Sequence, residues 1–97
     1  AGESSAVVLA RVIAARDKQY ARQGKVNAAL SVSELDTSAR IQKEAQEALG
    51  NLLEKLSLSA RSFHRIMRVA RTLADLAGDE EVGRSHVLKA VSFRRAL

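Results

Sequence analysis

Three arginines in one stretch of the chain, Arg61, Arg65 and Arg68, have the type and spacing to bind a phosphate. They are spaced i, i+4 and i+7, which places them on one face of a helix predicted from 60 to 77. Ser59 is a suitable N-cap, so Arg61 lies in the first turn, where the helix already carries partial positive charge. A cation there breaks a local preference, and such places are often functional. The amides of that turn and a planar guanidinium together suit a phosphate group.

Few other side chains suggest chemistry. His64 and His86 are the only histidines and lack companions at metal-ligand spacing, so we expect no metal site. No carboxylate pair stands near a nucleophile. No phosphate-binding loop of the form GxxxxGK followed by Ser or Thr occurs either, so the chain alone is not expected to hydrolyse a nucleotide. Asp75 lies four residues after Arg71, a pairing worth roughly a few tenths of a kcal/mol if exposed.

A second basic row, Arg11, Lys18 and Arg22, follows the spacing i, i+7 and i+11 on a helix predicted from about 5 to 23. The row is either a solvated helix face or a surface that faces a nucleotide, a neighbouring subunit or nucleic acid. The apolar residues of the same helix are expected to be buried: Val8, Leu9, Val12, Ile13, Ala15 and Tyr20.

Composition indicates one small all-α domain. The chain has 97 residues, no proline, 3% aromatic residues and long stretches of good helix formers. The absence of cysteine excludes a disulfide framework and a thiolate metal site, and it fits a reducing compartment. No apolar run approaches the roughly 20 residues that span a bilayer, so we expect no membrane partner. The net charge of +5 suggests an anionic partner.

Apolar spacing and cap residues predict four helices, at about 5–23, 42–56 and 60–77 and from the cap Ser85 onward. A loop with Ala28 and Leu30 as anchors and a short turn capped by Ser33 join the first two. A tight link should pair the second and third helices antiparallel. Gly50 either allows a close helix crossing or marks a weak point. Val82 is expected to make a short extended contact before the last helix, and Phe93 to be buried as part of that helix. Arg94 and Arg95 are expected to form a basic tail.

The segment LSARSFHRIMRVARTLADLAGDEEVGRSHVLKAVSFR resembles the C-terminal helical domain of the magnesium chelatase subunit I-like AAA+ ATPases, in particular their ComM-like branch. The earlier segment GESSAVVLARVIAARDKQYARQGKVNAALSVSELD is similar to the part that opens the same domain. Val7-Val8-Leu9 is more apolar than that branch suggests. The resemblance covers nearly the whole chain, so residues 1–97 are identified as a single C-terminal lid domain of a longer protein.

The resemblance implies a small four-helix lid that closes over ATP and Mg bound to a core domain elsewhere in the same polypeptide. Arg61, in the small-x-Arg pattern of Ser59-Ala60-Arg61, matches the sensor 2 arginine, which stabilises charge in phosphoryl transfer. Arg68 matches a second recurring arginine, and Arg65 on the same face is a further candidate nucleotide contact. No cofactor is expected to bind tightly to the lid alone. The resemblance also implies a cytoplasmic ring, typically a hexamer.

Two hypotheses for function remain open. In the first, the chain is the lid of a ring-forming motor that acts on DNA, as in the ComM-like branch, or drives metal insertion, as in the chelatases. In the second, it is a free-standing basic helical module that binds nucleic acid. A phosphate-binding loop upstream in the gene would favour the first.

Overall fold

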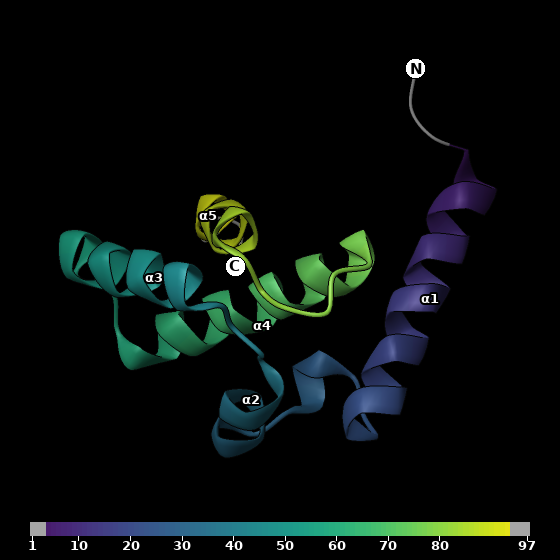
Figure 1. Cartoon of the computed structure of the whole chain (residues 1–97), viewed down its shortest axis with the longest axis horizontal. Coiled ribbons are helices and arrows are strands. Elements are labelled where there is room, and N and C mark those ends of the chain that lie inside the picture. The colour runs from purple at the N-terminus through teal and green to yellow at the C-terminus, as the bar shows by residue number, and fades with distance from the viewer. Residues whose placement is uncertain (1–3, 94–97) are drawn as a thin grey trace.

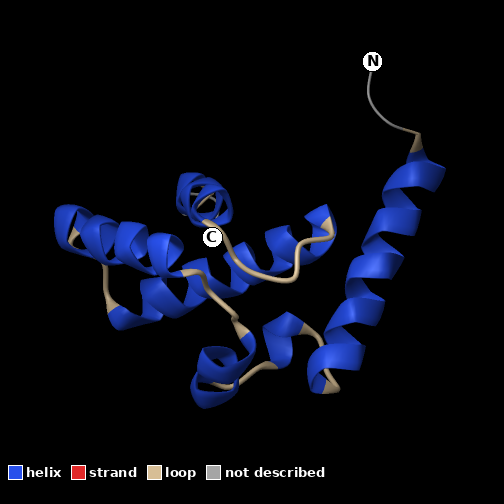
Figure 2. Ribbon diagram, viewed as in Figure 1, coloured by secondary structure: helices blue, strands red, loops and turns tan. Residues whose placement is uncertain are grey.

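The computed structural model describes residues 4–93 and builds this part of the chain from helices without a strand (Figures 1 and 2). The all-α prediction is therefore confirmed. The predicted tail Arg94 and Arg95 lies outside the described residues. Five α-helices and one 3-10 turn follow in order: α1 (Ser5–Gln23), η1 (Asn27–Ala29), α2 (Val32–Ser38), α3 (Lys43–Leu56), α4 (Ala60–Ala77) and α5 (Arg84–Ser92).

The ends of the two longest helices lie where the sequence predicts them. Ser4 caps α1, because its hydroxyl oxygen accepts a hydrogen bond from the amide of Val7. Ser59 caps α4 in the same way through the amide of Ser62. Gly24 and Gly78 end these helices in the left-handed conformation, with φ values of 75° and 81°.

The start of α2 differs from the prediction. Ser31, not Ser33, is its N-cap: the Ser31 hydroxyl accepts from the amide of Glu34, and the Glu34 carboxylate accepts from the amide of Ser31. This reciprocal capping box satisfies two amides, whereas a lone cap satisfies one. Lys25 adds an ion pair to Glu34 at 2.8 Å.

The start of α5 also differs. Gly83, not Ser85, precedes the first helical residue. The amide of Gly83 donates to Nδ1 of His86 at 2.8 Å, and the Nε2 of His86 lies 2.9 Å from an Asp79 carboxylate oxygen. His86 is therefore half-buried and engaged in the turn, although the sequence suggests an exposed residue.

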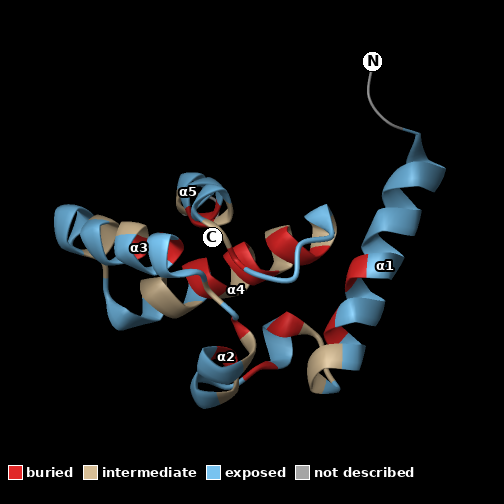
Figure 3. Cartoon of the chain, viewed as in Figure 1, coloured by how far each residue is buried: buried red, intermediate tan, exposed pale blue. Residues whose placement is uncertain are grey.

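The hydrophobic core lies where α5 packs against both α3 and α4 (Figure 3). Figure 1 shows α3 and α4 running in opposite directions from their short link, as predicted. Ile66, Ala70 and Ala74 of α4 are almost completely buried, as are Val87 and Ala90 of α5. Phe93 is exposed instead, because it follows the last turn of α5 and lies beyond this contact.

Val82 makes the short extended contact that the sequence predicts. It forms a parallel bridge with Ile41: its amide donates to the carbonyl of Arg40, and its carbonyl accepts from the amide of Gln42, both at 2.9 Å. The side chain of Val82 is fully buried. The bridge thus fixes the segment before α5 against the segment before α3.

The predicted burial of the apolar residues of α1 is wrong, except for Ala15. Only Ala15 and Gln19 of α1 are buried, both in its second half, where α1 packs against α4. Figure 1 shows the first half of α1 extending beyond the other helices, and Figure 3 shows it exposed. The exposed residues are Val8, Leu9, Val12, Ile13 and Tyr20, between 44% and 58% accessible. Their spacing is typical of a buried helix face, but no described residue buries them.

Gly50 has no close neighbour, so the predicted close helix crossing does not occur. It is exposed in the middle of α3, and a Cβ built on it would meet no atom within 4 Å. Gly50→Ala is therefore expected to raise the free energy of unfolding by about 1 kcal/mol, because alanine loses less backbone entropy on folding. Urea denaturation measures the change. Gly78→Ala, at φ 81°, is the matched control and should destabilise; a loss of stability in Gly50→Ala would contradict the prediction.

Candidate functional site

Arg61 lies exposed in the first turn of α4. Its side chain makes no hydrogen bond or ion pair with any residue between 4 and 93. The hydroxyl of Ser59 binds the amide of Ser62, which leaves the amides of Ala60 and Arg61 as donors of the kind that every helix start carries. A guanidinium and backbone amides are therefore available together at one helix end.

The other two arginines of the row do not share one environment. Arg65 is exposed, one turn after Arg61. Arg68 is half-buried, and its guanidinium donates to the carbonyl of Leu30 at 2.9 Å. Its Nε is buried without a partner among the described residues. Arg68 thus ties α4 to the segment before α2, and it would have to leave Leu30 to meet a nucleotide.

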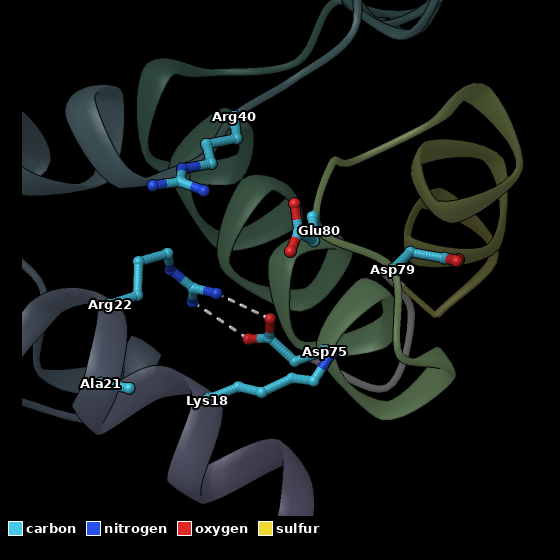
Figure 4. Close-up of a pocket in the computed structure, with 7 residues that line it drawn as sticks. All are labelled: Lys18, Ala21, Arg22, Arg40, Asp75, Asp79 and Glu80. Carbon is cyan, nitrogen blue, oxygen red and sulfur yellow. Dashed lines mark hydrogen bonds and ion pairs between the residues drawn. The ribbon is translucent and has the colours of Figure 1, made fainter.

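Arg71 and Asp75 lie inside the protein, although the sequence suggests that they border the arginine face. Both side chains are 0% exposed, and an Arg71 nitrogen lies 3.0 Å from an Asp75 carboxylate oxygen. Arg22 from α1 donates to both oxygens of the same carboxylate, at 2.8 and 3.1 Å (Figure 4). The pair is therefore part of a buried triad with charges from two helices, and the few tenths of a kcal/mol expected for an exposed pair do not apply.

Asn27 completes this arrangement from η1. Its side-chain amide donates to Asp75 at 2.9 Å and to the hydroxyl of Thr72 at 3.0 Å. Its backbone amide donates to the buried side-chain oxygen of Gln19 at 2.8 Å. We call Arg22, Asn27, Arg71 and Asp75 the buried polar cluster. It joins α1, η1 and α4, and its members satisfy one another except at Nε of Arg71, which is buried without a partner among the described residues.

Arg71 also holds two connecting segments. Its guanidinium donates to the carbonyl of Ala39, before α3, and to those of Asp79 and Glu80, after α4, at 2.9 to 3.1 Å. These carbonyls lie outside helices and cannot be satisfied by helical hydrogen bonds. A five-donor guanidinium suits several acceptors at once, which explains why an arginine occupies this interior position.

Two members of the basic row of α1, Lys18 and Arg22, bond to α4 and its C-terminal end, although Arg11 and Lys18 are exposed. Lys18 donates to the carbonyl of Gly78 at the C-terminal end of α4, at 3.2 Å, and Arg22 belongs to the buried polar cluster. A cation at a helix C-terminus is favourable, because the carbonyls there carry partial negative charge. Neither sequence-based interpretation of the row describes Lys18 and Arg22, which serve to attach α1.

A cavity of about 280 Å³ lies beside this cluster (Figure 4). Its charged lining consists of three cations and three carboxylates, so it has no net charge with which to attract a nucleotide. The lining residues are Lys18, Ala21, Arg22, Arg40, Asp75, Asp79 and Glu80. Within residues 4–93 no three His, Asp or Glu side chains are placed to hold a metal ion. None of the described helices is long and apolar enough to cross a bilayer.

The cluster makes stability depend on acidity. Burial alone would raise the pKa of Asp75, but hydrogen bonds from Arg22 and Asn27 and the charge of Arg71 outweigh it and lower the pKa below its ordinary 3.8. Burial lowers the pKa of Arg71, and the Asp75 carboxylate opposes that change. The unfolded Asp75 therefore takes up a proton at a higher pH than the folded one.

Stability is thus expected to fall as the pH drops below about 4, since protons then favour the unfolded state. The measurement is urea unfolding from pH 7 to pH 2.5, for the wild type and Asp75→Asn. The variant should be less stable at pH 7 and should decline less steeply in acid. Glu34, whose pKa is lowered to about 2 chiefly by its hydrogen bond with Lys25, titrates in both proteins and cancels in the comparison. Parallel pH profiles would contradict the assignment to Asp75.

One signal for this cluster was present in the sequence, although the charges of Arg71 and Asp75 concealed it. These two residues lie four and eight positions after Met67, which is buried, and they adjoin Ala70 and Ala74 on the same side of α4. Their helix positions thus belong to the core face. Asn27 carried no comparable signal, because it reaches the cluster through the fold of the η1 segment, whereas Gln19 lies four positions after the buried Ala15 on the same side of α1.

The chain matches the family described as magnesium chelatase, subunit ChlI C-terminal, over residues 2–94. It is 38% identical over 93 residues to the competence protein ComM of Haemophilus influenzae and 42% identical over 93 residues to the uncharacterised protein YifB of Escherichia coli. Each match covers 96% of this chain but 18% of the relative. An uncharacterised protein of Mycobacterium bovis is 37% identical over 98 residues, which cover 97% of this chain and 20% of that protein. The chain therefore spans about a fifth of the length of these curated relatives.

Proposed function

Because this chain belongs to the magnesium chelatase subunit ChlI C-terminal family, a domain of AAA+ ATPases, we propose that it is the lid of such an ATPase and that Arg61 is its sensor 2 arginine. The lid closes over ATP and Mg held by a core domain in the remaining part of the polypeptide. Closure brings the Arg61 guanidinium to the terminal phosphate, where it stabilises the charge that develops during phosphoryl transfer. The parent protein works as a cytoplasmic ring, a hexamer by the same resemblance.

The observation that carries this proposal is the contrast between Arg61 and the last two arginines of α4. Arg68 and Arg71 are engaged with carbonyls of this chain, whereas Arg61 is exposed beside the amides that begin the helix. A helix start that holds a guanidinium and free amides fits a phosphate, which needs both charge and hydrogen-bond donors. Arg65, exposed one turn later, is placed to contact the same nucleotide.

Rigid attachment of α4 supports the same function. The buried polar cluster and the core hold α4 to α1, α3 and α5, so a force on Arg61 moves the domain as one body. AAA+ lids couple nucleotide state to ring movement in this manner. The test is ATP hydrolysis by the full-length parent with Arg61→Ala; normal turnover would reject the sensor assignment.

We propose DNA as the substrate of the motor, because the ComM-like branch is the one that the chain resembles and the net charge is +5. The alternative of a free-standing nucleic-acid module is less well supported. Arg22, Arg68 and Arg71 are engaged inside the domain, which reduces the basic surface that a free-standing binder would need. Stimulation of the parent ATPase by DNA tests the substrate; the absence of stimulation would reject DNA.

A further inference from the structure

The first half of α1 carries large aliphatic side chains over about two-thirds of its circumference. Positions 7, 8, 9, 12 and 13 are Val, Val, Leu, Val and Ile, and successive positions turn by about 100° around a helix. All five side chains are about half exposed. A continuous exposed apolar patch marks an interaction surface. This half of α1 therefore has a partner outside the described residues.

The patch continues into a groove between α1, α4 and α5. The groove has a volume of about 520 Å³; Val8 and Val12 form one wall, and Leu73, Leu76 and Ala77 form the other. Ser85, His86 and Lys89 of α5 and Arg11 of α1 complete its lining. We call it the α1–α5 groove. Both walls of the groove are aliphatic, so a segment that binds there must bring apolar side chains of its own.

The charge at the groove specifies the occupant further. Arg11 and Lys89 contribute two cations from opposite helices, and no carboxylate lines the groove in the part of the chain that the structure describes. The nearby Asp79 is already paired with His86 at 2.9 Å. Cations beside aliphatic walls complement an apolar segment that carries acidic residues at its border.

We propose that the first half of α1 and the α1–α5 groove dock an apolar, acid-bordered segment of the same polypeptide that lies outside these 97 residues. The relatives are about five times as long as the chain, because 96% of the chain covers 18% of their length. The partner surface is therefore available in the same molecule. This inference rests on the proposed function, because it takes the remaining polypeptide to contain the ATPase core. It gives the lid a second contact with that core, besides the one that Arg61 makes.

Hydrogen exchange on the full-length parent tests the docking surface. The backbone amides of residues 5–16 should exchange more slowly in the parent than in the 97-residue chain. Val12→Glu should abolish that protection, because a carboxylate then faces an acidic partner in an apolar contact. Val32→Glu is the matched control: both valines are 47% exposed, but Val32 lies on α2, away from the groove. It should leave the protection unchanged, and neither variant should change the melting temperature of the 97-residue chain.

Two results would overturn the docking proposal. Equal exchange of residues 5–16 in the parent and in the 97-residue chain would show that nothing covers them. Sedimentation of the 97-residue chain as a dimer that Val12→Glu dissociates and Val32→Glu does not would assign the surface to a second copy. The Arg61 experiment separates the two proposals. Protection of α1 with normal hydrolysis in Arg61→Ala rejects the sensor function alone, and lost hydrolysis without protection rejects the docking alone.

Discussion

Asp75→Ala is expected to lower the free energy of unfolding by about 3–5 kcal/mol, the cost of removing one partner of a buried ion pair. The variant leaves the guanidinium of Arg71, which is 0% exposed, and that of Arg22, which is 12% exposed, without their shared carboxylate. It also leaves the side chain of Asn27 without one of its acceptors. Since small domains have a total stability of about 5–15 kcal/mol, a large share of the fold's stability depends on this carboxylate.

Urea denaturation at pH 7 measures this loss. Asp36→Ala is the matched control, because Asp36 is an exposed carboxylate of α2, and its loss should stay within about 0.5 kcal/mol. Arg71→Met should also destabilise, since it releases the carbonyls of Ala39, Asp79 and Glu80 together with Asp75. If Asp75→Ala and Asp36→Ala lost equal stability, the cluster would not be closed in solution.

The second large effect is on hydrolysis. Arg61→Ala in the full-length parent is expected to reduce kcat for ATP by about 10²–10³-fold, the usual effect of removing one preorganised donor to a transition state. Nucleotide binding should change much less, because the interaction is strongest when charge develops on the phosphate. Folding should be unaffected, since Arg61 is exposed and has no partner among residues 4–93.

Two matched variants sharpen this experiment. Arg65→Ala removes a neighbouring exposed arginine and should reduce kcat less than Arg61→Ala does. Arg68→Ala removes the hydrogen bond to Leu30, so its effect should appear as lost stability. A kcat for Arg61→Ala equal to that of the wild type would exclude the sensor role, and so would a defect confined to nucleotide binding.

The sequence predicted the elements of this fold better than it predicted their environments. Helix ends depend on local chemistry, so Ser59, Gly24 and Gly78 marked ends of α1 and α4 correctly, and Ser4, one of two candidate caps with Ser5, begins α1. The start of α5 was one such end that failed, because the cap there comes from the imidazole of His86 and not from a serine. At α2 the choice of Ser33 over Ser31 was wrong for another reason, because it passed over a capping box with Glu34 that local chemistry does signal.

The candidate site was predictable only at its exposed end. Arg61 could be placed from its spacing and its distance from Ser59, and it lies on the surface as expected. Arg71 and Asp75 were treated as surface residues because of their charge, although their helix positions belong to the core. Burial of a charge depends on partners from distant segments, here Arg22 and Asn27, and no local pattern reveals that those segments meet.

The way in which α1 is attached has a mechanical consequence. Hydrogen bonds from Lys18 and Arg22 attach its second half to α4, and its aliphatic first half extends from this pivot. At about 1.5 Å per residue, the 19-residue helix is about 28 Å long. A tilt of about 10° at the pivot would then carry the far tip about 4 Å. The contacts around Asp75 thus set where the tip of α1 lies, and with it the position of any partner that binds there.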